Sequence, residues 1–91
     1  MPVIVRWPGV AVRNATCDTP IHCTDFMPTL ARAAGARADT AVDGLDFTPL
    51  LRQPASKLER DALYFHYPHY YSTTSPASAV RVGDLKLIHY F

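Results

Sequence analysis

Apolar residues follow a helical spacing in one part of the chain. Between residues 25 and 34 they recur every three or four positions, at Phe26, Met27, Leu30, Ala33 and Ala34. This spacing predicts an α-helix over about 25–34. Thr24 or Asp25 is placed to cap its start, and Gly35 is placed to close its end. Pro28 falls in the first turn, where backbone N–H groups lack helical partners.

Other segments are rich in β-branched and aromatic residues and predict strands. They lie near residues 3–5, 62–66, 79–82 and 85–90. Pro8-Gly9 predicts a turn after the first strand. Gly83-Asp84 separates the last two strands, and a two-residue turn that begins with glycine suits the twist of an antiparallel hairpin. Thr48–Arg52, with a proline near its start, predicts a short helical turn.

Composition limits the kinds of function that the chain can have. Its 91 residues, 48% of them apolar and 19% charged, are typical of a single soluble globular domain. The net charge is +1 and the basic residues are scattered, which argues against a nucleic-acid partner. No apolar run approaches the roughly 20 residues of a membrane span. Met1–Pro8 lack a signal-peptide pattern, and the compartment stays open, because a signal for the periplasm or for secretion could lie upstream.

Both ends of the chain lie in or close to predicted strands. The chain opens almost at once in a strand of the buried type and stops inside another. Natural domains usually place such strands behind polar termini, because an unpaired strand edge promotes aggregation. The sequence is therefore expected to be a piece of a larger structure.

The cysteines and carboxylates give no pattern of a metal site. Cys17 and Cys23 have five residues between them, so a single disulfide and two reduced thiols both stay open. Neither belongs to a Cys-x-x-Cys pair, and the eight carboxylates are dispersed without metal-ligand spacing. We therefore expect no metal site within this chain.

Three blocks of sequence cover nearly the whole chain. They are Pro2–Gly9, then Thr24–Gly35 with Asp43–Leu51, and last Leu63–Tyr70 with Ala79–Ile88. In this order and spacing they resemble the C-terminal part of sulfatases, within the alkaline-phosphatase-like superfamily. The third block, rich in tyrosine and histidine, is most similar to sulfatases of the arylsulfatase A-like type.

The resemblance implies an α/β fold. Residues 1–52 would end the main α/β domain and its large sheet, and residues 53–91 would begin a small C-terminal subdomain, an antiparallel sheet with a packed helix. It also implies a sulfuric ester hydrolase that cleaves sulfate esters or sulfamates. Full-length members use a formylglycine nucleophile, made from cysteine or serine, and calcium or a similar divalent ion that polarises the sulfate. The partner would be a sulfate ester or a sulfated glycan.

The catalytic part of that family has no counterpart in this sequence. The modification signal resembles Cys-x-Pro-x-Arg, but the stretch that begins at Cys17 places its proline one position too late and has no arginine. Cys23 is followed by Thr24-Asp25, without proline. We expect the nucleophile and the metal site to lie upstream, and the chain alone to be inactive.

His66, His69 and Tyr70 are the candidate substrate-binding residues. Aromatic faces stack on a sugar or aryl ring, and imidazoles hydrogen-bond to hydroxyls or to sulfate. The alternatives are simple packing and a His-x-x-His metal site, although Pro68 breaks any helix that would align the two histidines. Arg81 and Lys86 are either solvated charges or contacts for an anion.

Two other functions stay open at this point. One is a non-catalytic truncated module, and the other is a fragment of a related phosphoryl-transfer hydrolase. The Tyr-Phe-His-Tyr-Pro-His-Tyr stretch of the third block favours a sulfatase over the second of these. An in-frame Cys-x-Pro-x-Arg motif upstream of Met1 would identify an enzyme fragment.

Overall fold

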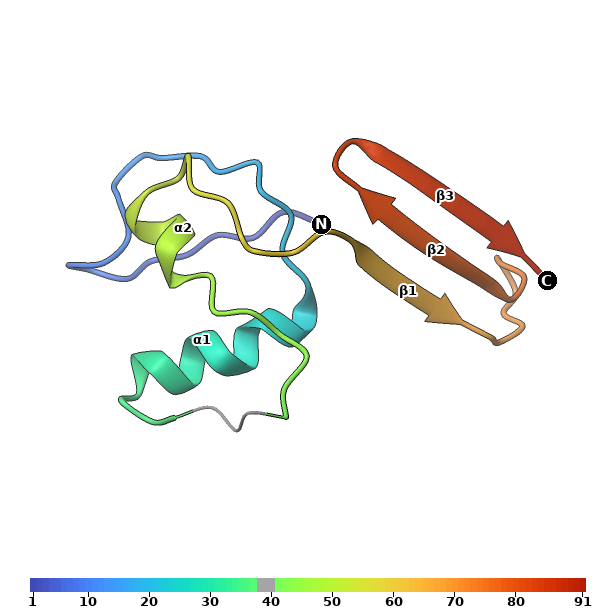
Figure 1. The fold of residues 1–91 in the computed structure, drawn as a ribbon, viewed down its shortest axis with the longest axis horizontal. Coiled ribbons are helices and arrows are strands. Elements are labelled where there is room, and N and C mark those ends of the chain that lie inside the picture. The colour runs from blue at the N-terminus through green and yellow to red at the C-terminus, as the bar shows by residue number, and fades with distance from the viewer. Residues whose placement is uncertain (38–40) are drawn as a thin grey trace. The chain divides into compact units, whose positions relative to one another are not determined.

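The chain forms two compact units, residues Met1–Leu58 and Glu59–Phe91. The computed structural model describes residues 1–37 and 41–91. Helices α1 and α2 belong to the first unit, and strands β1, β2 and β3 belong to the second (Figure 1). Neither helix of the described residues has the length and apolar character that crossing a bilayer requires. The boundary between residues 52 and 53 concerns the domains of a longer protein and stays a prediction.

Helix α1 confirms the helix that its apolar spacing predicts. A short 3₁₀ turn, Cys23–Asp25, leads directly into α1, which comprises Phe26–Ala33. Gly35 has a φ of +71°, which ends the helix. Its N–H donates to the carbonyl of Arg32 at 3.0 Å, and the N–H of the next residue donates to that of Ala31 at 2.9 Å. These two bonds satisfy the last carbonyls of the helix, as a glycine-terminated helix end requires.

Asp25 is fully buried and does not cap α1 with its side chain, contrary to the capping role that its position predicts. Its carboxylate instead accepts a hydrogen bond from the backbone N–H of His22 at 2.7 Å, which caps the 3₁₀ turn. The other oxygen accepts from the N–H of Leu45 at 2.8 Å. Asp25 therefore joins two segments that are 20 residues apart in the chain.

The segment that follows Leu45 is held against α1 by further contacts. Thr29 donates its hydroxyl to the carbonyl of Asp25 at 2.7 Å and accepts from the N–H of Phe47 at 3.0 Å. The ring of Phe47 meets that of Phe26 edge to face, with centroids 5.4 Å apart. Phe47 and Leu50 are both 4% exposed and form the small apolar core.

Helix α2 comprises Thr48–Arg52 and confirms the predicted helical turn. Its start is fixed by Asp46, whose Oδ1 accepts from the N–H of Thr48 at 2.8 Å and from its hydroxyl at 2.5 Å. The second carboxylate oxygen of Asp46 lies 3.3 Å from Nε of Arg32 on α1. One aspartate therefore connects both helices of the first unit.

Residues 3–5 form no strand, so that prediction is wrong for this structure. Extended backbone becomes a strand only when a neighbouring strand pairs with its N–H and C=O groups. No described segment pairs with residues 3–5, and Ile4 is 97% exposed. The predicted turn does form, because the carbonyl of Trp7 accepts from Val10 and Ala11 and Gly9 has a φ of +80°. The predicted place of residues 3–5 in a larger sheet stays a prediction.

The second unit is an antiparallel sheet in the order β1-β2-β3. Its strands are Leu63–Tyr67, Ala77–Val82 and Leu85–Tyr90, as the sequence predicts to within two residues. Val82 pairs with Leu85, so Gly83-Asp84 is a two-residue turn. Gly83 has a φ of +56°, a value that glycine adopts without strain. The predicted hairpin is confirmed.

The register assigns the residues of the sheet to two faces, because side chains alternate along a strand. We call one the charged face: Leu63, Phe65, Tyr67, Ala77, Ala79, Arg81, Lys86, Ile88 and Tyr90. We call the other the histidine face: Tyr64, His66, Ser78, Val80, Val82, Leu85, Leu87 and His89. Large apolar side chains are exposed on both faces, such as Leu87 at 70% and Ile88 at 43%.

Gly44 lies against the backbone that precedes α1, and its replacement tests that contact. A Cβ at this position would come 2.0 Å from the carbonyl oxygen of Thr24 and 2.9 Å from the nitrogen of Asp25. We expect Gly44→Ala to lower the free energy of unfolding by about 3 kcal/mol, since backbone atoms must move to admit the methyl group. Urea unfolding of the 91-residue chain, followed by the fluorescence of Trp7 in the same unit, measures the change.

Gly35→Ala is the matched control for this substitution. A Cβ there meets nothing within 4 Å, so only the left-handed backbone opposes it, at a cost of about 1–2 kcal/mol. A loss for Gly44→Ala no larger than that of the control would contradict the close contact.

Candidate functional site

His66 lies on β1, on the histidine face, and belongs to a row of polar residues across the sheet. It pairs with Ser78 on β2, and Ser78 pairs with His89 on β3. Nδ1 of His66 lies 2.7 Å from the hydroxyl oxygen of Ser78. This contact fixes the imidazole of His66 over the middle strand and leaves its Nε2 for another partner.

Phe91 closes the end of this row. Its ring meets the imidazole of His66 with centroids 5.9 Å apart and that of His89 at 5.4 Å, both edge to face. The backbone N–H of Phe91 donates to the carbonyl of Pro76 at 3.1 Å, which holds the last residue beside the start of β2. Two imidazoles, a hydroxyl and an aromatic ring therefore lie together at this end of the sheet.

His69 lies in the segment that joins β1 to β2, and its ring does not share the neighbours of His66. Its ring meets that of Tyr67 edge to face, with centroids 5.4 Å apart. Tyr67 is on the charged face, whereas His66 is on the histidine face. The structure therefore gives the two histidines different surroundings, although only two residues separate them.

Tyr70 projects from the same segment and is 86% exposed. The next residue, Tyr71, begins a tight turn in which its N–H and C=O exchange hydrogen bonds with those of Thr74, at 3.1 and 3.2 Å. This turn orders the tip of the segment beside an exposed tyrosine. We call residues 66–71, which are the end of β1 and the start of the segment that follows it, the aromatic loop.

Potential metal ligands are dispersed among the described residues. Residues 1–37 and 41–91 contain no group of three or more His, Cys, Asp or Glu side chains that could hold a metal ion. One of the eight carboxylates, Asp39, lies outside the described residues. Cys17 and Cys23 both have free thiols, so the structure has no bridge between them.

Sequence reasoning missed Ser78, His89 and Phe91 as neighbours of His66. The hairpin turn predicts the pairing of β2 with β3, and so the proximity of Ser78 and His89. It does not predict which residue of β2 faces His66, because the connection from β1 is long and its turn has no strong sequence signal. The pairing of Tyr67 with Ala77 supplies this register.

The sequence of residues 1–91 matches the family described as N-sulphoglucosamine sulphohydrolase, C-terminal. It is 41% identical over 73 residues to the steryl-sulfatase of Rattus norvegicus, a match that covers 78% of this chain and 12% of that protein. It is 36% identical over 91 residues to the arylsulfatase A of Homo sapiens, covering 99% of this chain and 17% of that protein.

In another relative, too, the match covers nearly all of this chain and only a small part of the relative. The chain is 31% identical over 97 residues to the N-acetylglucosamine-6-O-sulfatase of Bacteroides thetaiotaomicron, covering 100% of this chain and 17% of that protein. The chain thus spans less than a fifth of the length of these relatives. It belongs to the sulfatase family and corresponds to the C-terminal region of a sulfatase.

Proposed function

We propose that residues 1–91 support the active site of a sulfuric ester hydrolase and form a wall on its substrate side. The nucleophile and the metal site would come from parts of the protein outside this chain. The observation that carries the proposal is the aromatic loop, which places Tyr70 at 86% exposure next to an ordered turn. An exposed tyrosine that directly precedes a hydrogen-bonded turn is suited to contact a ligand ring.

The side chains of the aromatic loop have the chemistry of a wall that holds a substrate in position. Tyr70 offers a face for stacking and a hydroxyl for hydrogen bonding. The imidazole of His69 has an aromatic neighbour in Tyr67 and donates or accepts through its ring nitrogens. These groups recognise a sugar or aryl ring and the hydroxyls around it, and none of them is a strong nucleophile.

The substrate class is a sulfate ester or a sulfated glycan. The names of the relatives refer to a sterol, an aryl group and an amino sugar, and the description of the family refers to N-sulphoglucosamine, which is a sulfamate. Aryl sulfates, sulfated glycans and sulfamates are therefore the compounds to test. Calcium and formylglycine, which the family implies, do not fit the residues that the structure describes in this chain. Its described residues have no cluster of metal ligands, and neither cysteine lies in a Cys-x-Pro-x-Arg motif. We assign no step of the reaction to either group here.

Replacing the exposed residues of the aromatic loop tests the proposed wall. In the complete gene product, His69→Ala and Tyr70→Ala should each lower kcat/KM by about tenfold for at least one accepted sulfate ester, equivalent to about 1.4 kcal/mol of transition-state stabilisation. Steady-state kinetics with aryl sulfates and sulfated oligosaccharides measure the change. Tyr64→Ala is the control, because Tyr64 is 77% exposed on β1 outside the loop. If kcat/KM is unchanged for every substrate, the loop has only a packing role and the proposed substrate contact is contradicted.

The 91-residue chain by itself should not turn over a sulfate ester. Cleavage needs a strong nucleophile and a metal-held anion site together, whereas positioned histidines acting as general acids or bases contribute only about 10²–10⁴-fold. The assay adds calcium and an activated aryl sulfate to the purified chain, with the complete gene product as the positive control. Turnover that persists after repurification and scales with the concentration of the chain would contradict the proposal. Failure of the complete gene product to cleave any sulfate ester would favour a non-catalytic module.

A further inference from the structure

Two cations lie directly opposite each other on the charged face of the sheet. Arg81 on β2 pairs with Lys86 on β3, one residue from the ends of the hairpin strands. Side chains of paired residues point to the same face with Cβ atoms about 4.5–5.5 Å apart, and like charges at such positions destabilise a sheet. The repulsion between the two cations is therefore unfavourable, and a bound anion would offset it.

Each cation is oriented by a neutral partner. Nε of Arg81 donates to the carbonyl of Gly83 at 3.0 Å, which draws the guanidinium toward the turn and leaves its two terminal nitrogens without a hydrogen bond to a described residue. Nζ of Lys86 lies 5.8 Å from the ring centroid of Phe65 on β1. Ala79, which lies between Phe65 and Ile88 in the register, is small enough to let the lysine stem cross the middle strand.

Among the described residues, no carboxylate forms an ion pair with either cation. Asp84 follows Gly83 in the turn, and Asp61 precedes β1, so these are the acidic residues nearest to the pair in sequence. Within residues 1–37 and 41–91, neither Asp61 nor Asp84 forms an ion pair with Arg81 or Lys86. Two positive charges therefore stand side by side with no negative charge from the described chain to balance them.

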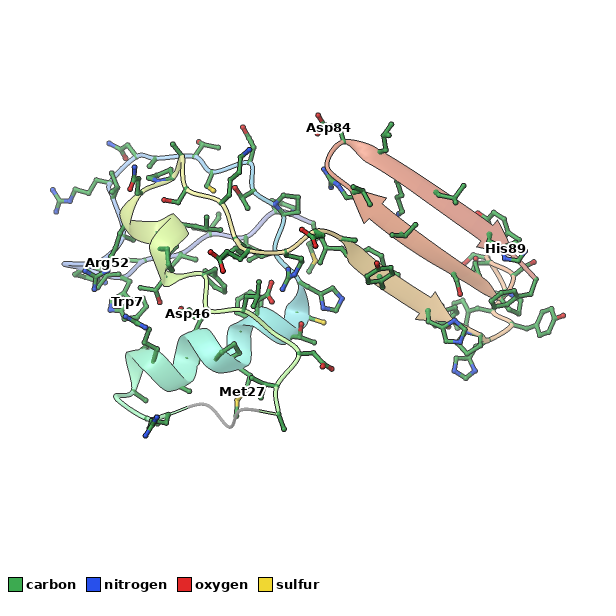
Figure 2. All side chains as sticks on the ribbon, viewed as in Figure 1. Trp7, Met27, Asp46, Arg52, Asp84 and His89 are labelled. Atoms are coloured by element: carbon green, nitrogen blue, oxygen red, sulfur yellow. The ribbon has the colours of Figure 1, made fainter. Side chains whose placement is uncertain are left out.

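The pair is separate from the aromatic loop. Figure 2 shows Asp84 at the turn between β2 and β3 and His89 near the far end of β3. Arg81 and Lys86 are close to the Asp84 end, where Arg81 also pairs with Leu63. Tyr67 of the aromatic loop is on the same face but pairs with Ala77 at the other end of the sheet.

We propose that Arg81 and Lys86 form a second binding site, which holds a sulfate group of a sulfated oligosaccharide. A guanidinium presents planar donors that fit the oxygens of a sulfate, and an ammonium adds a point charge beside it. Phe65 and Ile88 provide an apolar surface next to the cations, which suits the faces of sugar rings. The choice of a sulfated glycan among polyanions rests on the proposed sulfatase function, and the site would hold a long substrate outside the reaction centre.

Direct binding measurements on the complete gene product test this site. The probe is a heparin octasaccharide, titrated by calorimetry at low ionic strength, with its desulfated form as the comparison ligand. The variant Arg81→Gln with Lys86→Gln should weaken binding of the sulfated probe at least tenfold, while its melting temperature without ligand stays the same or rises. Arg81→Lys keeps the charge but loses the planar donors and the bond to Gly83, and we expect a smaller loss.

The control is Arg13→Gln with Lys57→Gln, which removes the same charge from exposed positions of the first unit. Equal losses in the two double variants, no loss in either, or equally tight binding of the desulfated probe would each overturn the site. Turnover of a small aryl sulfate should not change in any of these variants, because such a substrate does not reach the second site. The complete gene product could bind the probe through Arg81 and Lys86 but cleave no sulfate ester. That result would overturn the proposed function and would support the second binding site.

Discussion

The first unit depends on a buried carboxylate. Asp25 is fully excluded from solvent, and burying a charge without partners would cost several kcal/mol. Hydrogen bonds from the N–H groups of His22 and Leu45 offset that cost and at the same time fix the distance between two distant segments. Once Leu45 is held, Thr29 reaches the N–H of Phe47, and the ring of Phe47 meets that of Phe26. The polar contacts of Asp25 and the small apolar core therefore hold the same two segments together.

The second unit is organised in a different way: the pairing of its strands holds it together, and its side chains form no buried core among themselves. Its three strands are in continuous register, yet most of their large side chains are exposed on both faces. A sheet that is stable by itself in water needs three or more strands with a hydrophobic face, or a packed helix, and in this unit large apolar side chains are left exposed. Local contacts, such as Lys86 over the ring of Phe65, stabilise particular positions without covering a face.

Local signals made much of the fold predictable. Apolar spacing and Gly35 define α1, a proline marks the start of α2, and Gly83-Asp84 sets the register of the hairpin. The role of Asp25 could not be predicted, because its partner Leu45 is 20 residues away and no pattern connects the two.

Part of the candidate site was predictable for the same reason. His66, His69 and Tyr70 are visible in the sequence as an aromatic and histidine-rich stretch, but the partners of His66 depend on the register between β1 and β2. Residues 3–5 have the composition of a strand but form none in this structure, because a strand also needs a neighbour and no described segment supplies one.

The two-residue turn at Gly83 also affects the order in which the chain folds. Strands that it joins meet after closing a very short loop, and such hairpins form within about 1–10 μs. The contacts of the first unit span 20 residues between Asp25 and Leu45 and 37 between Thr19 and Ser56, so they form against a larger loop entropy. We therefore expect the hairpin to form before these longer-range contacts, while its apolar side chains are still exposed to water. A chaperone that binds exposed apolar strands would meet this part of the molecule before the buried carboxylate has assembled the rest.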